Sequence, residues 1–98
     1  MEQIQPGTFK ILRTDGTAEL IHEKPSIARI LKEIDAETLD TVTLDRNSRQ
    51  IMAVDDTGMI DGKPVNPQAT ALYLSICRPG TNYAICGDVV LVNDRDFA

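Results

Sequence analysis

The side chains of this chain that could do chemistry are few, and they lie far apart in the sequence. Cys77, Cys86 and His22 are its only thiols and imidazole, and two cysteines with one histidine cannot complete the usual four-ligand zinc site. The chain has no Gly-x-Ser-x-Gly motif and no glycine-rich motif for a phosphate or a dinucleotide. We therefore expect a protein that acts by binding rather than by catalysis, with a small hydrolase as the weakest alternative.

Three aspartates, Asp55, Asp56 and Asp61, could offer oxygen ligands to a cation. A calcium loop needs a carboxylate at its twelfth position, and none stands there when Asp55 is taken as the first. Aspartate beside glycine is also a common turn former. The sequence therefore predicts turns here, and neither a metal nor a cofactor.

A better candidate for a site is the start of a helix expected over residues 67–76. The free N–H groups and the dipole of a helix start favour a negative charge, and Lys63 lies just before it. Asn66 followed by Pro67 is also typical of a structural helix cap, and a simple cap would accept Asp in place of Asn66. Both interpretations stay open at this point. The candidate ligand-binding residues are Lys63, Asn66, Gln68, Thr70 and Arg78.

The two cysteines are separated by a short loop, so a disulfide between Cys77 and Cys86 is geometrically possible. The N-terminus lacks the hydrophobic segment of a secretory signal, which favours a reducing compartment and a cytoplasmic location. We expect both thiols to be buried and unreactive.

The elements that position these residues follow from the spacing of apolar side chains. Two predicted strands, residues 9–13 and 18–22, flank Asp15-Gly16, and this dipeptide favours a two-residue type I′ turn. A helix follows, with Ser26 as its N-cap and apolar residues at the spacing i, i+3, i+4, i+7. The four residues expected to face the core are Ile27, Ile30, Leu31 and Ile34.

A second hairpin is predicted over residues 40–44 and 49–54, because both runs are rich in β-branched or apolar residues that alternate with polar ones. The helix over residues 67–76 follows this hairpin. The side chains that it should bury are Ala69, Leu72, Tyr73 and Ile76.

The last predicted strand is residues 89–92, Val-Val-Leu-Val, a continuous apolar run of the kind found in strands covered on both faces. The predicted order is therefore ββ-α-ββ-α-β. It indicates one small α+β domain over residues 1–98, with a mainly antiparallel sheet as one layer and the two helices as the other.

Composition and charge narrow the classes of partner. Apolar residues make up 42% of the chain and charged residues 26%, which argues against disorder. The net charge is −5 and neither half of the chain is basic, so we expect no direct binding to nucleic acid, which needs Lys and Arg to displace counterions. No apolar run is long enough for a membrane span.

Three segments near the candidate site resemble a known family. They are Val-Asp-Asp-Thr-Gly at 54–58, Gly-Lys-Pro-Val-Asn-Pro-Gln-Ala-Thr-Ala-Leu at 62–72 and Ile-Cys-Gly-Asp-Val-Val-Leu-Val at 85–92. Over about residues 8–93 the chain is similar to the family catalogued as domain of unknown function 3846. It departs from the family pattern at Asp56, where Glu is usual, and at Lys63, which intrudes before Pro64.

The resemblance implies a small protein of phages, plasmids or conjugative elements, and it implies no activity. We therefore expect a non-catalytic accessory protein of a mobile element that binds a host protein through an acidic surface. The alternative is an oligomeric sponge for a nucleotide-like anion held near Lys63, Asn66 and Arg78. Because so short a chain has little room for a pocket within one subunit, the sponge version predicts a homodimer or larger.

Overall fold

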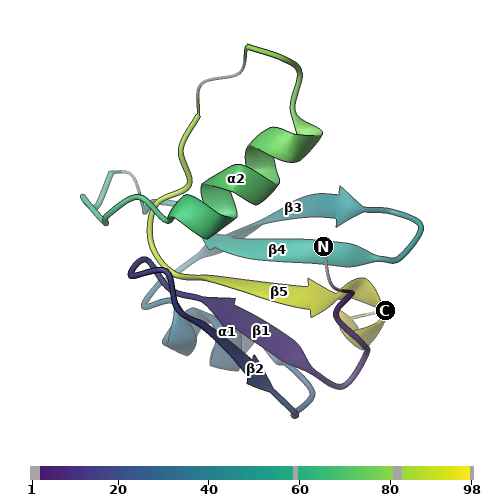
Figure 1. Ribbon diagram of the computed structural model, residues 1–98. Helices are drawn as coiled ribbons and strands as arrows, with labels where there is room; N and C mark the ends of the chain where they lie inside the picture. Colours follow the sequence, from purple (N-terminus) through teal and green to yellow (C-terminus); the bar gives the residue numbers. More distant parts are fainter. Residues whose placement is uncertain (1–2, 59, 81–82, 98) are drawn as a thin grey trace.

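One five-stranded antiparallel sheet forms the centre of the protein in the computed structural model, which describes residues 3–58, 60–80 and 83–97 (Figure 1). The spatial order of the strands is β2-β1-β5-β4-β3. The predicted α+β class, the antiparallel sheet and the element order are confirmed, and a short 3-10 helix is added at the end. The elements are β1 (Phe9–Leu12), β2 (Ala18–Ile21), α1 (Ile27–Glu33), β3 (Leu39–Asp45), β4 (Gln50–Asp55), α2 (Pro67–Ile76), β5 (Val89–Asn93) and η1 (Asp94–Phe97).

The strand that comes last in the sequence, β5, lies in the middle of the sheet between β1 and β4. All of its residues are buried. Val89 and Leu91 pack into one apolar cluster, whereas Val90 and Val92 pack into another. This alternation places one cluster on each face of the sheet, and it confirms that the apolar run is covered on both faces.

The two helices cover opposite faces of the sheet, so the molecule has three layers instead of the expected two (Figure 1). Ala69 of α2 packs with Met52 and Val54 of β4, while Ile30 and Ile34 at α1 pack against the other face. The reason lies in β4 and β5, whose apolar residues point both ways and require a cover on each side. In the part of the chain that the structure describes, no helix is long and apolar enough to cross a membrane.

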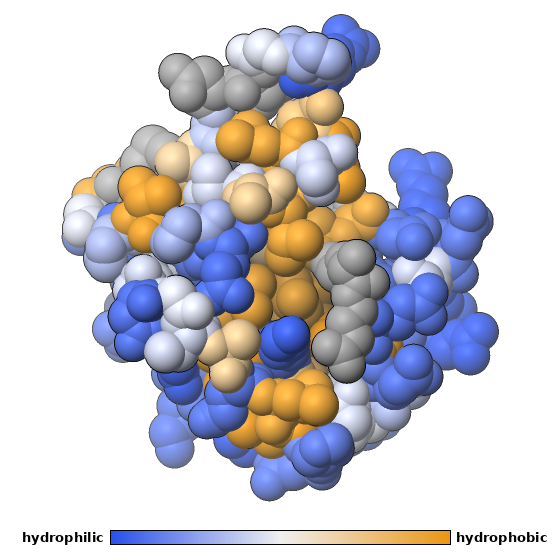
Figure 2. Space-filling view, in the orientation of Figure 1, coloured by the Kyte–Doolittle hydropathy of each residue, from blue (hydrophilic) through white to orange (hydrophobic). Residues whose placement is uncertain are grey.

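Apolar side chains are unevenly spread on the face that carries α2. They gather along α2 and over the centre of the sheet, between hydrophilic margins (Figure 2). Of the four α2 residues expected to be buried, Ala69 is fully buried, Leu72 and Tyr73 are half-buried, and Ile76 is exposed.

The turn between β1 and β2 is wider than the predicted type I′ turn. Arg13 N donates to Thr17 O at 2.9 Å, and Gly16 N donates to Arg13 O at 3.1 Å. Gly16 has a φ of +89°, but Asp15 has no positive φ, which a type I′ turn would require at both central residues. Asp15 instead accepts from Thr17 N at 2.9 Å and thereby fixes the turn.

Only part of the predicted apolar stripe of α1 is buried. Ser26 caps the helix as expected, because its side chain accepts from Arg29 N. Ile30 and Ile34 are buried, whereas Ile27 is half-exposed and Leu31 is half-buried at the rim of a groove. The seven-residue helix therefore packs against the sheet mainly through Ile30 and through Ile34 at its C-cap.

Core truncation should separate these two kinds of position. Ile30→Ala removes a fully buried side chain and should lower the free energy of unfolding by about 2–4 kcal/mol. Leu31→Ala should cost less than half as much, because Leu31 lies at the rim. Urea denaturation monitored by circular dichroism measures both, and equal losses would show that the register of α1 is different.

Candidate functional site

A groove of about 1030 Å³ opens beside the C-terminal end of α1. Its walls are the outer side of α1, residues 35–38 before β3, and four residues that follow β4: Thr57, Ile60, Asp61 and Lys63. We call it the Ile60 groove, after the apolar side chain that is 85% exposed within it. Carboxylates and apolar side chains line it together: Asp35, Glu37, Asp61, Leu31, Ala36 and Ile60.

Lys63 lines the same groove, but its ammonium contacts protein groups instead of facing the groove as a free charge. Its ammonium lies 2.5 Å from Asp55 Oδ2 and donates to the carbonyls of Ile34 and Asp35 at 3.0 and 2.5 Å. The ammonium is thus hydrogen-bonded to two carbonyls and ion-paired with one carboxylate. The two carbonyls belong to the end of α1, where backbone acceptors lack a helical partner. Lys63 therefore ties the end of α1 to the end of β4.

The end of α1 has a defined geometry of its own. Asp35 adopts the left-handed region with a φ of 53°. Ala36 N donates to Leu31 O at 3.0 Å, and Asp35 N donates to Lys32 O at 3.3 Å. This is the Schellman arrangement that ends many helices, with Asp in the place where Gly is usual. It turns two carbonyls toward Lys63.

Asp55 is held in its ionised form. Burial raises the pKa of its carboxyl, but the ammonium of Lys63 and the N–H of Thr57 at 3.0 Å outweigh burial, and the pKa of Asp55 is lowered. The Asp55 side chain is only 1% exposed. The buried carboxylate therefore depends on Lys63 for its charge balance.

Asn66 is fully buried and does more than cap α2. Its Oδ1 accepts from Ala69 N at 3.1 Å, as a helix cap does. Its Nδ2 donates to Leu12 O at 2.9 Å and to Gly87 O at 3.0 Å, and its own N–H donates to Ile85 O at 2.8 Å. Every donor of the amide is thus bonded to protein. The side chain joins α2, the end of β1 and the segment before β5.

The other three candidate residues make separate contacts, and none of them lines the Ile60 groove with Lys63. Gln68 Nε2 donates to Thr17 O at 3.2 Å, across to the first hairpin. Thr70 Oγ1 accepts from Ile85 N at 3.0 Å. Arg78 follows the other end of α2, about 15 Å along the axis from the helix start. The structure does not bring the five residues into one pocket, so anion binding by them stays a prediction.

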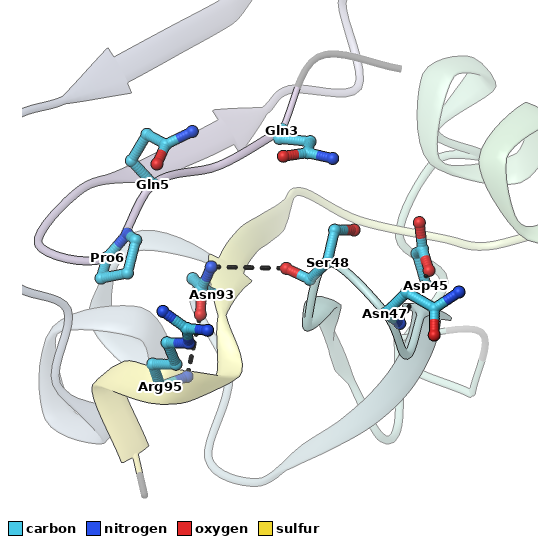
Figure 3. Close-up of a pocket in the computed structure, with 8 residues that line it drawn as sticks. All are labelled: Gln3, Gln5, Pro6, Asp45, Asn47, Ser48, Asn93 and Arg95. Atoms are coloured by element: carbon cyan, nitrogen blue, oxygen red, sulfur yellow. Dashed lines mark hydrogen bonds between the residues drawn. The ribbon is translucent and has the colours of Figure 1, made fainter.

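A second hollow, of about 360 Å³, lies where residues 3–6 cross the ends of the sheet (Figure 3). Two buried amides bind the backbone of Ile4: Asn93, which lines the hollow, donates from Nδ2 to Ile4 O at 3.1 Å, and the side chain of Gln50 both donates to and accepts from Ile4. These bonds fasten the N-terminal segment to β4 and β5. The lining residues are Gln3, Gln5, Pro6, Asp45, Asn47, Ser48, Asn93 and Arg95.

The residue types singled out first for chemistry are dispersed. Cys77 and Cys86 are free thiols, each half-buried instead of buried. His22 is exposed after β2. Among the described residues, no three His, Cys, Asp or Glu side chains are grouped closely enough to hold a metal ion.

Comparison of the chain with family models, with curated proteins and with solved structures finds no match. The resemblance to the family of domain of unknown function 3846 therefore stays a prediction.

Substitution of Asn66 by Asp tests whether this residue is only a cap. The change keeps an acceptor for Ala69 N but loses both side-chain donors and sets carboxylate oxygen against the carbonyls of Leu12 and Gly87. We expect a loss of about 2–4 kcal/mol in the free energy of unfolding. Ser26→Asp, at the exposed cap of α1, is the matched control and should be nearly neutral. Equally small changes in the free energy of unfolding for the two variants would show that Asn66 is only a cap.

Removal of the Lys63 ammonium should be severe. Lys63→Met keeps the alkyl stem but leaves the Asp55 carboxylate buried without its counter-ion, so we expect a loss of about 3–5 kcal/mol. Lys32→Met, in the exposed part of the same groove, should change stability by less than about 0.5 kcal/mol. Chemical denaturation of both variants measures the difference, and a near-neutral Lys63→Met would contradict the assigned role.

The ion pair of Asp55 and Lys63 makes the stability of the fold depend on pH. Because the pKa of Asp55 is lowered in the folded protein, its ionised form stabilises the fold above its unfolded pKa of about 3.9. That contribution is lost as the pH falls through the lower, folded value. We expect a shallower loss of stability with acid in Asp55→Asn than in the wild type, measured by urea midpoints between about pH 2.5 and pH 6. Parallel curves would rule out the contribution.

Proposed function

We propose that this protein is a non-catalytic accessory protein of a phage or other mobile element, and that it binds a host protein in the host cytoplasm. The observation that carries the proposal is the Ile60 groove. Ile60 is 85% exposed and shares the groove with Leu31 and Ala36. Apolar side chains exposed within a charged rim are typical of surfaces that bind another protein.

The charges of the groove support a basic partner. Asp35, Glu37 and Asp61 contribute three carboxylates against the one exposed ammonium of Lys32, and the whole chain carries a net charge of −5. Lys63 does not offset these carboxylates at the surface, because its ammonium is bonded to Asp55 and to the end of α1. A partner with an apolar anchor among Lys and Arg side chains complements this surface.

The anion-sponge alternative has less support from the contacts. Lys63 and Asn66 direct their donors to protein acceptors, which leaves neither side chain to receive a nucleotide. The resemblance to a family of mobile elements remains compatible with both functions.

The residue on which the proposal depends was not singled out in the sequence. Ile60 stands between Gly58 and Gly62, in a segment that belongs to no strand or helix able to bury it. An apolar residue inside such a glycine-bounded turn is the signal that could have marked it.

Affinity capture from host-cell extract tests the proposal. Tagged wild type should enrich one host protein, and Ile60→Asp should lose it, since a charge replaces the apolar anchor. Leu20→Asp, at an exposed apolar position on β2, is the matched control and should keep the partner. Quantitative mass spectrometry measures the enrichment. A partner retained by Ile60→Asp, or no enriched protein at all, would count against the proposal.

A further inference from the structure

The open side of β3 has the features of a site for another strand. β3 is hydrogen-bonded to β4 on one side and forms the border of the sheet on the other (Figure 1). It is seven residues long, whereas β2 at the opposite border has four. Long open edges of this kind accept an added strand unless side chains protect them.

The backbone groups that point outward can be assigned from the ladder. Thr38 O accepts from Asp56 N, so bonding to β4 falls on every second residue from Thr38 to Val42, before the register shifts between Thr43 and Asp45. Leu39, Thr41 and Thr43 therefore direct their N–H and C=O groups away from β4. The contact of Thr41 agrees, because its N–H donates to the side chain of the adjacent Asp40 at 2.9 Å.

An apolar slot of about 190 Å³ adjoins this edge on the face that carries α1. Leu39 and Thr41 of β3 form its border, Ile51 forms part of its floor, and Ile27 and Phe97 stand exposed at its rim. The slot lies beside α1, whose residues Ile27 and Ile30 also line it. A strand beside β3 would place alternate side chains next to the slot.

The charges on β3 indicate which strand would fit. β3 carries Asp40 and Asp45 and no basic residue. A second copy pairing through the same strand would bring four carboxylates to one seam, which disfavours self-pairing. A segment with Lys or Arg opposite Asp40 would draw the carboxylate away from Thr41 and release that N–H for the new ladder.

We propose that β3 is a docking edge for an extended, basic segment of a partner protein, which adds a sixth strand and places an apolar side chain in the slot. Leu39, Thr41 and Thr43 supply the main-chain bonds, and Asp40 selects a basic residue. This surface is separate from the Ile60 groove, and the inference does not rest on that groove.

Selection from a displayed library of random linear peptides tests the inference with the wild-type protein as bait. Selected peptides should alternate Lys or Arg with apolar residues and should slow hydrogen exchange of the Thr41 and Thr43 amides. Thr41→Pro removes an outward N–H without touching the ladder to β4, and should weaken binding by about tenfold or more. Leu20→Pro, on the open side of β2, is the control and should bind within about twofold.

A second arm needs no protein variant. A selected peptide methylated at alternate backbone nitrogens on its β3-facing side should lose binding to the wild type, while methylation at the other positions should not. Failure to select any peptide, peptides that bind Thr41→Pro as well as the wild type, or indifference to the methylation pattern would each overturn the inference. A dimer of the wild-type chain that pairs through β3 would overturn the choice of partner.

Discussion

The side-chain amide of Asn66 is the contact on which most of this fold depends. One buried group accepts from the first turn of α2 and donates to the last carbonyl of β1 and to Gly87 just before β5. Three segments that are distant in the sequence therefore meet beside the isolated backbone bridge between Val65 and Cys86. Removal of such a group leaves several buried polar atoms without partners at once, which costs more than the loss of one bond.

Lys63 performs a corresponding task at the end of α1. It neutralises a carboxylate at the end of β4 and completes the hydrogen bonding at the end of α1. α1 is too short to be stable by itself, so its position is set by Ile30, Ile34 and this ammonium together. Lys63 and Asn66 are three positions apart, and their contacts tie this short segment to the sheet and to both helices.

Local order could be predicted from the sequence, because strand alternation, helical spacing and caps depend on near neighbours. The bounds of α2 and the caps Ser26 and Asn66 are confirmed on that basis. The number of layers could not be predicted, since spacing shows that a helix has an apolar side but not which face of the sheet it meets. The site was harder still. The charge of Lys63 suggests a ligand site in the sequence. Only the fold shows that its ammonium pairs with Asp55 and donates to a carbonyl at the end of α1.

The position of β5 has a consequence for how the chain reaches this state. The two hairpins, β1–β2 and β3–β4, each form from adjacent residues, yet they do not pair with each other. β5 joins them, with Leu12 opposite Val89 and Met52 opposite Leu91. During synthesis each hairpin therefore keeps an apolar face and an open edge until β5 has left the ribosome. Folding is then governed by long-range closure and is slow for a chain of this size, and the nascent protein is exposed to misassembly until its central strand arrives.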